Sequence, residues 1–281
     1  MSEFHAPARS WRWLAALAIV ATIALNAWSN IQPFNGQTMG AVSAKYPTPI
    51  TPAGYAFSIW GLIFLGLLVY AVWQLLPAQR DNALPDAIAK PLTLASLATA
   101  AWVVLFGFEL IALSVVAMAV ILGALMLVYG KARPLVLSKV APFWVSWPFA
   151  VYLAWISVAA AINFTIGLQQ LGWQTGPELS VWLAYLLIGV VALVALVVTA
   201  GYQDWAFALT VSWALIGIWV ARLREETTLA WVTLAVAVAV AVIGFAAARQ
   251  GSKRQPWEVA SLAAAHENER ILAEKAQVQG S

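Results

Sequence analysis

The chain has 281 residues, of which 63% are hydrophobic and only 10% are charged. Soluble domains carry roughly 25% charged residues, because polar side chains must cover a surface in water. These proportions exclude an ordinary soluble domain and predict an integral membrane protein. The absence of cysteine excludes disulfides, thiolate metal sites and cysteine nucleophiles. The two histidines, His5 and His266, lie near the termini, so neither a histidine metal site nor a Ser-His-Asp triad is expected within the membrane.

Eight apolar segments are long enough to cross a bilayer as helices, since a hydrocarbon core of about 30 Å needs about 20 helical residues. The runs are unbroken rather than alternating, which disfavours a β-barrel. We therefore expect an all-α, polytopic membrane helix bundle, with Thr51 as N-cap and Pro52 at the first position of the second span. The third and fourth spans are interrupted only by Glu109, which predicts a tight helical hairpin there. The predicted spans are 11–30, 51–76, 91–108, 110–130, 142–168, 179–200, 204–221 and 228–248.

The basic residues predict the orientation, because cytoplasmic connectors are enriched in lysine and arginine. With the N-terminus in the cytoplasm, only Lys45, Arg222 and Arg224 of the 15 basic residues fall in outside connectors. We therefore expect both termini in the cytoplasm and a multi-pass protein of a bacterial inner membrane. We expect three parts: a five-span domain at 1–170, three additional spans at 171–250 and a polar cytoplasmic tail at 251–281.

Sixteen tryptophans are the most conspicuous feature of the composition. Tryptophan gathers at the headgroup level, so an aromatic belt explains those near span ends. Four others, Trp60, Trp102, Trp155 and Trp213, lie well inside their predicted spans. An indole N–H at that depth prefers a polar partner, so these rings are expected to face the bundle interior, where they either fill a core or line a pocket. The twelve tryptophans assigned to span ends, connectors or tail are Trp11, Trp13, Trp28, Trp73, Trp144, Trp147, Trp173, Trp182, Trp205, Trp219, Trp231 and Trp257.

Aromatic residues recur on one helical face in three of the spans. The stretch 46–73 reads YPTPITPAGYAFSIWGLIFLGLLVYAVW, in which Phe57, Trp60 and Phe64 follow at spacings of three and four. The third span ends with AAWVVLFGF, residues 100–108, in which Trp102 is the third residue. The fifth span contains WPFAVYLAWISVAAAIN. Helical periodicity puts four of its residues on one face of the helix: Tyr152, Trp155, Ala159 and Asn163.

These strings resemble the TspO/MBR family, the tryptophan-rich sensory proteins related to the translocator (peripheral benzodiazepine receptor) protein. Pro52, Phe57 and Trp60 resemble the opening of the family's second helix. The family's fifth-helix string, P-Y-L-x-W with alanine and asparagine four and eight residues on, is similar to the stretch from Tyr152 to Asn163. The resemblance covers roughly residues 11 to 168, the first five spans.

The chain departs from the family's pattern in several places. Pro148 lies four residues before the tyrosine instead of directly before it, and Thr99 stands about where the family has an asparagine. After Asn163 the chain reads FTIGLQQL, without the basic residue of the motif proposed for cholesterol contact, so sterol binding is not supported. Three further spans follow the usual five, which implies an enlarged bacterial branch.

The resemblance implies a binding site for a flat hydrophobic ligand of the tetrapyrrole class, such as haem or protoporphyrin, used for sensing, regulation or transport. Indole and phenyl faces stack on planar macrocycles, and mid-membrane polar side chains orient their edges. Because no axial ligand for iron lies inside the spans, we expect ligand stacking and neither a cofactor nor a metal. The expected pocket, closed from outside by the connector 31–50, is formed by Tyr55, Phe57, Trp60, Trp102, Tyr152, Trp155, Ala159 and Asn163.

Two other functions stay open. Eight spans suit a facilitative transporter of a small apolar molecule, although Glu109, Glu178 and Asp204 fall at predicted turns, which disfavours ion coupling. The aromatic residues also suit a structural or assembly protein without a ligand. An enzyme is disfavoured, because no carboxylate pair or nucleophile with base can be assembled within the spans. The expected partners are the lipid bilayer and a hydrophobic small molecule, with no nucleic acid, and family members often form a homodimer.

Overall fold

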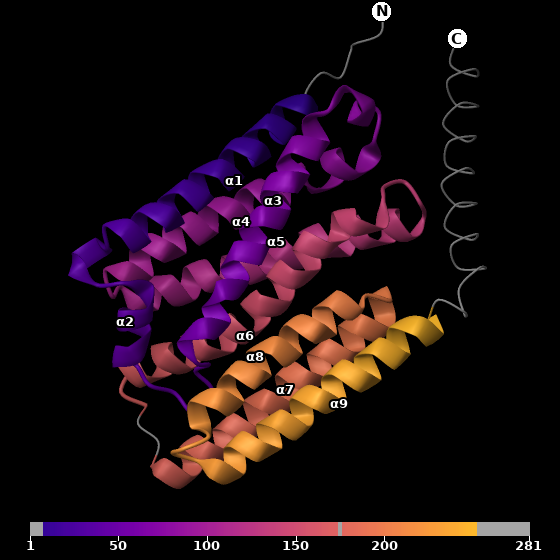
Figure 1. Cartoon of the computed structure of the whole chain (residues 1–281). Coiled ribbons are helices and arrows are strands. Elements are labelled where there is room, and N and C mark those ends of the chain that lie inside the picture. Colours follow the sequence, from indigo (N-terminus) through magenta and orange to yellow (C-terminus); the bar gives the residue numbers. More distant parts are fainter. Residues whose placement is uncertain (1–7, 174–175, 252–281) are drawn as a thin grey trace, which may run out of the picture.

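The computed structural model describes residues 8–173 and 176–251. Within these ranges all regular structure is helical, so the expected all-α fold class is confirmed. The expected tail at 251–281 lies outside the described residues, apart from the end of the last helix. The α-helices are α1 (Ala8–Ile31), α2 (Met39–Lys45), α3 (Ile59–Leu75), α4 (Ala83–Gly107), α5 (Ile111–Leu137), α6 (Trp147–Gln170), α7 (Pro177–Tyr202), α8 (Trp205–Arg222) and α9 (Thr227–Gly251) (Figure 1). Four 3₁₀ turns lie between them: η1 (Phe34–Gly36), η2 (Gly54–Ser58), η3 (Pro77–Gln79) and η4 (Phe143–Ser146).

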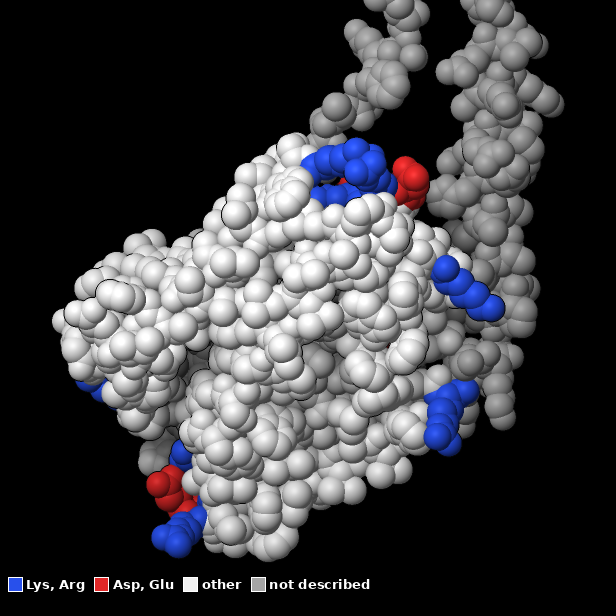
Figure 2. All heavy atoms as spheres, turned by 45° about the horizontal axis from the view of Figure 1, so that its top comes forward, with Lys and Arg blue, Asp and Glu red and all other residues white. Residues whose placement is uncertain are grey.

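Eight of these helices, all except α2, are long and apolar enough to cross a membrane, and each coincides with one predicted span. The short helix α2 lies in the connector between the first two spans. Charged side chains gather at the ends of the helices, and a broad uncharged face separates them (Figure 2). The protein is therefore a multi-pass membrane protein.

Two predicted helix starts are wrong, both at prolines. The helix α4 begins at Ala83 instead of 91, because the Asn82 side chain caps the backbone N–H of Leu84 (3.0 Å) and Pro91 is accommodated inside the helix. Thr51 does not cap the second span: its hydroxyl pairs with Thr48 (2.8 Å), and η2 precedes α3. Prolines hold this segment extended before the span begins, so its first turn is set by tertiary contacts.

The predicted hairpin at Glu109 is confirmed. The helix α4 ends at Gly107 and α5 begins at Ile111, and Glu109 takes a left-handed conformation (φ 57°) between them. The Leu110 N–H returns to the Leu105 carbonyl (2.9 Å), which closes the turn.

The first five spans pack side by side in a ring, with neighbours in the order α1, α3, α6, α5 and α4. The last three spans pack on one another, and α8 places this group against α6 and η2 (Figure 1). One continuous set of buried apolar residues runs from α1 through α9. The two groups of helices therefore share a core, and the expected boundary at residue 170 stays a prediction.

A buried ion pair joins the two groups at one end of the bundle. Arg133 of α5 donates to the carbonyls of Tyr202 (2.9 Å) and Gln203 (2.7 Å) in the turn between α7 and α8. Asp204 lies 3.7 Å from Arg133 and accepts a hydrogen bond from Tyr129 (3.0 Å). Burial raises the pKa of Asp204, and Arg133 opposes that shift. Because these partners satisfy Arg133, α5 continues to Leu137, beyond the predicted end at 130.

A close helix crossing in the five-span ring, between α3 and α6, depends on Gly66. A Cβ at Gly66 of α3 would lie 2.8 Å from Pro148 Cγ of α6, whereas a Cβ at Gly61 of the same helix would meet nothing within 4 Å. We therefore expect Gly66→Ala to destabilise the protein by about 1–3 kcal/mol, because a proline ring cannot move aside.

Gly61→Ala is the matched control and should be neutral or stabilising by up to about 1 kcal/mol, through helix propensity. Thermal unfolding in detergent, followed by circular dichroism, measures both variants. Equal midpoints for the two variants would contradict the close crossing.

Candidate functional site

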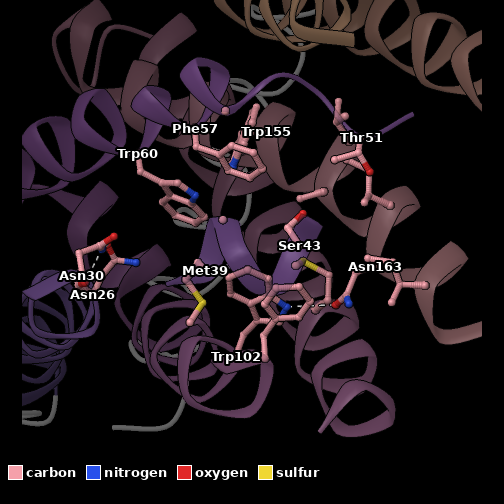
Figure 3. A pocket seen from close by; sticks show the side chains of 18 residues that line it. Asn26, Asn30, Met39, Ser43, Thr51, Phe57, Trp60, Trp102, Trp155 and Asn163 are labelled. Carbon is pink, nitrogen blue, oxygen red and sulfur yellow. Dashed lines mark hydrogen bonds between the residues drawn. The ribbon is translucent and has the colours of Figure 1, made fainter. Parts of the chain in front are cut away.

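A cavity of about 290 Å³ lies inside the five-span ring, where α1, α3, α4, α5 and α6 converge beneath α2 (Figure 3). It combines aromatic walls with a small number of polar side chains, as ligand pockets do. The cavity is lined by Asn26, Asn30, Met39, Gly40, Ser43, Thr51, Gly54, Phe57, Trp60, Trp102, Phe106, Met118, Trp155, Val158, Ala159, Ile162, Asn163 and Ile166.

Tryptophans from three separate spans form the aromatic walls. Trp102 of α4 stacks nearly parallel on Phe106 (14°, centroids 5.0 Å apart). Trp155 of α6 meets Phe57 edge to face (83°, 5.6 Å). Trp60 of α3 reaches the same cavity, and Figure 3 shows the three indoles around one space. The walls therefore present large flat surfaces held at fixed angles.

Asn163 is the polar centre of the cavity. Its side-chain oxygen accepts a hydrogen bond from Trp102 Nε1 (3.0 Å), and its amide nitrogen donates to Ser114 Oγ (3.1 Å). The Ser114 hydroxyl in turn lies 2.8 Å from the Ile111 carbonyl, to which it donates. This series of hydrogen bonds fixes the plane of the Trp102 ring and gives its N–H an acceptor away from water.

Six of the eight expected site residues line the cavity: Phe57, Trp60, Trp102, Trp155, Ala159 and Asn163. Tyr55 and Tyr152 do not. Tyr55 is 43% exposed and packs its ring edge-on against Trp213 (87°, 5.4 Å). Tyr152 is fully buried behind Trp60, and its hydroxyl pairs with Thr99. The helical stripe of α6 placed Tyr152 near the site, but its hydroxyl already has a partner inside the bundle.

The expectations did not include the contribution of α1. Asn26 and Asn30 line the cavity from one helical turn to the next, and Asn30 Nδ2 donates to the Asn26 carbonyl (2.8 Å). Two asparagines four residues apart at the end of an apolar run are the sequence signal for this wall.

The connector between α1 and α3 covers the cavity, as expected from the sequence. Its helix α2 contributes Met39, Gly40 and Ser43 to the lining. A Cβ at Gly107 of α4 would lie 2.9 Å from Met39 Cε and 3.2 Å from Phe34 Cβ, so the connector rests directly on the α4–α5 hairpin. We call residues 34–46 the lid.

Glu109 latches the lid to the hairpin. Its carboxylate accepts hydrogen bonds from Lys45 Nζ (2.6 Å), the Tyr46 hydroxyl (2.9 Å) and Gln37 Nε2 (3.4 Å). The hydrogen bonds from Lys45 and then Tyr46 lower the pKa of Glu109 below its ordinary value, against a smaller opposing effect of burial. Burial, and secondly the Glu109 carboxylate, raise the pKa of Tyr46. The charged form of Glu109 therefore favours the closed lid.

A second, larger cavity of about 530 Å³ lies between α3, α6 and α8. Its lining is almost entirely apolar and includes Trp144, Trp147, Trp205 and Trp213. The first cavity is the candidate site, because several polar side chains converge there, as in ligand pockets, whereas the larger one has almost none. Within residues 8–173 and 176–251, no group of three His, Cys, Asp or Glu side chains is placed to hold a metal ion.

Fold and site together define a polytopic helical membrane protein with an aromatic cavity under a lid. The chain belongs to the family of TSPO-like proteins, whose pattern matches residues 12–246. The match continues past residue 170 and includes all eight spans, where the resemblance noted in the sequence reached only the first five. Comparisons with curated proteins and with solved structures found no match.

The latch predicts a pH-dependent lid. Because the pKa of folded Glu109 is lowered, the latch stabilises the closed lid above the ordinary pKa of glutamate, and this contribution is lost as pH falls through the lowered value. The chain has no cysteine, so a single Ala44→Cys on α2 can carry a spin label. Label mobility at pH 7 should increase with Glu109→Gln, and in the parent chain it should increase only on acidification.

Glu178→Gln, at the start of α7, is the control and should leave the label unchanged. A label that is equally immobile with and without Glu109→Gln would show that the apolar contacts hold the lid alone.

Proposed function

We propose that this TSPO-like protein binds a flat hydrophobic ligand of the tetrapyrrole class in the aromatic cavity, for sensing, regulation or transport. The observation that carries the proposal is the convergence of Trp60, Trp102 and Trp155, from three spans, on one cavity. Filling a core does not require an open volume bounded by three indoles, whereas stacking on a planar molecule does. Asn163 and Ser43 supply polar atoms for the edge of such a ligand.

The size of the cavity bears on how such a ligand enters. About 290 Å³ stands at the lower end of ligand pockets, which span roughly 300–1,000 Å³. A macrocycle would therefore occupy the cavity together with the space now taken by α2. Ligand entry through displacement of the lid follows, and the Glu109 latch would set its energetic cost.

Stacking, and not ligation through iron, is the proposed mode of binding, and we propose no catalytic step. The proposed ligand contacts are aromatic faces and neutral amide or hydroxyl groups. Neutral amides and hydroxyls orient a bound molecule without acting as a strong acid or base. The proposed role is therefore capture and release of a ligand.

The distribution of charge supports a lid on the outside of the membrane. Basic residues prefer the cytoplasmic side, and the two helix ends differ strongly in the described ranges. The end where α1 begins has eight basic and three acidic residues: Arg9, Arg12, Arg80, Lys90, Lys131, Arg133, Lys139, Arg249, Asp81, Asp86 and Asp204. The opposite end has three basic and four acidic residues: Lys45, Arg222, Arg224, Glu109, Glu178, Glu225 and Glu226. We therefore propose a bacterial inner membrane, cytoplasmic termini and a lid that faces away from the cytoplasm.

Ligand binding is tested by titrating the purified protein with protoporphyrin and following tryptophan quenching. The parent chain should show saturable quenching, and Ala159→Phe should abolish it because the added ring fills the cavity. Trp60→Phe and Trp155→Phe should each weaken binding about threefold to tenfold, through loss of stacking area.

Trp182→Phe is the matched control, since Trp182 is 69% exposed on α7, away from the cavity. Its affinity should equal that of the parent chain. Absence of saturable quenching in the parent chain would contradict the proposed function. A structural role or a different apolar ligand would then be the remaining explanation.

The orientation is tested with reporter fusions. A reporter that is active only in the cytoplasm should work when fused after Ser281 and fail when inserted in the connector 171–176 between α6 and α7. The reverse pattern would overturn the proposed orientation.

A further inference from the structure

The segment from Thr51 to Phe57, which we call the strap, has two faces. Thr51, Gly54 and Phe57 line the ligand cavity at intervals of three residues. Pro52 and Ala56, between them, are buried on the other side. From Gly54 onward the strap is part of the 3₁₀ turn η2, in which residues three apart, here Gly54 and Phe57, share a face. The strap is thus a thin wall, with the cavity on one side and something else on the other.

That other side is α8, the middle helix in sequence of the last three spans. The Ala53 N–H donates to the Gly217 carbonyl of α8 (2.9 Å), and Trp213 Nε1 donates to the Ala56 carbonyl (3.0 Å). The two hydrogen bonds run in opposite directions, so each element supplies a donor and an acceptor. Trp213, the fourth deep tryptophan, therefore donates its indole N–H to the backbone of the cavity wall.

Packing at this contact leaves no room for a side chain at Gly217. A Cβ there would lie 2.8 Å from Ala56 Cβ and 2.9 Å from Pro52 Cβ. The Trp213 ring also meets Tyr55 edge to face (5.4 Å). Four strap residues, Pro52, Ala53, Tyr55 and Ala56, are thus held by contact with one helix.

The strap is not a stable element by itself. It consists of an extended stretch with Pro52, which has no N–H to donate, followed by the start of the short 3₁₀ turn η2, and the Ala56 N–H bonds to the Ala53 carbonyl (2.9 Å) where the two meet. Because isolated 3₁₀ turns are short and weakly bonded, the strap takes its position from its surroundings. The position of Phe57, and through it the edge-to-face contact with Trp155, consequently depends on α8.

We propose that Gly217 and Trp213 of α8 are positioning residues of the ligand site, and that the last three spans sense occupancy of the cavity through the strap. The proposal rests on the proposed function, because it concerns the same cavity. Neither residue lines the cavity, so each acts through the strap. Coupling is reciprocal: if α8 sets the affinity, the bound ligand must in turn alter the stability of α8.

The test uses the full chain in detergent with protoporphyrin as the probe. Trp213→Phe keeps an aromatic ring and removes the N–H, and it should raise the dissociation constant for protoporphyrin about fivefold. Gly217→Ala forces the strap toward the cavity and should raise this dissociation constant about tenfold. Gly189→Ala is the matched control, since a Cβ at Gly189 in α7 meets nothing within 4 Å, and it should bind like the parent chain.

Hydrogen exchange separates positioning from general stability. In the parent chain, protoporphyrin should slow amide exchange in α8 around residues 213–221 as well as in the strap. In Trp213→Phe the slowing should persist at the α6 side of the cavity and be lost in α8. A variant that is merely less stable would show faster exchange throughout, with the α8 response to ligand intact.

The possible failures are distinguishable. If the parent chain shows no saturable binding, the proposed function is overturned and the coupling with it. If the parent chain binds and Trp213→Phe keeps its affinity and its α8 response, only the role of α8 is overturned. Should Gly217→Ala fail to fold, Trp213→Phe decides the matter alone.

Discussion

The hydrocarbon core supplies no hydrogen-bond partner, and this constraint bears on two of the four deep tryptophans. Burial of an indole N–H at that depth costs free energy that an acceptor within the protein offsets. Trp102 finds the Asn163 side chain and Trp213 finds the Ala56 carbonyl. Each of these bonds joins two elements distant in sequence, so satisfying the indoles also assembles the site. The bond from Trp102 orients one wall of the cavity, and the bond from Trp213 anchors the backbone of the strap, which is another wall.

The connector between α1 and α3, which includes the short helix α2, is the part of the cavity wall that packing of the membrane spans alone does not define. It is held from two directions, by the Glu109 latch at the α4–α5 hairpin and by α8 behind the strap. The latch is a partly exposed charge cluster, whereas the strap contact is close-packed and carries no charge. A partly exposed ion pair is weak and sensitive to salt and pH, and a close-packed contact is neither. The lid is therefore the side of the cavity suited to opening, and the strap is the side suited to holding its shape.

Much of this arrangement was predictable, for reasons that differ between elements. Span length and charge placement predicted all eight membrane helices, and Glu109 predicted the hairpin because a charge cannot sit between two apolar runs of that length without a turn. Pro91 misled the prediction, because this proline lies inside α4, whose capped start is at Asn82, and does not begin the helix. Tyr152 was expected at the cavity because it shares a helical stripe with Trp155, yet neither Tyr152 nor Tyr55 lines the cavity, and their rings contact Trp60 and Trp213 instead. Side-chain direction at a helix start depends on the 3₁₀ geometry of η2, which the pattern of residue types does not encode.

The sequence by itself determined that the protein lies in a membrane and how many spans it has, because both follow from local composition and period, and its resemblance to the TspO/MBR family singled out the three tryptophans that meet at the cavity. The tertiary structure alone decided that α1 supplies two asparagines, that Ser114 completes the polar centre and that α8 stands behind the strap. These contacts join residues from 49 to more than 150 positions apart. No local period records such pairings, since they depend on which helices become neighbours when the whole bundle packs.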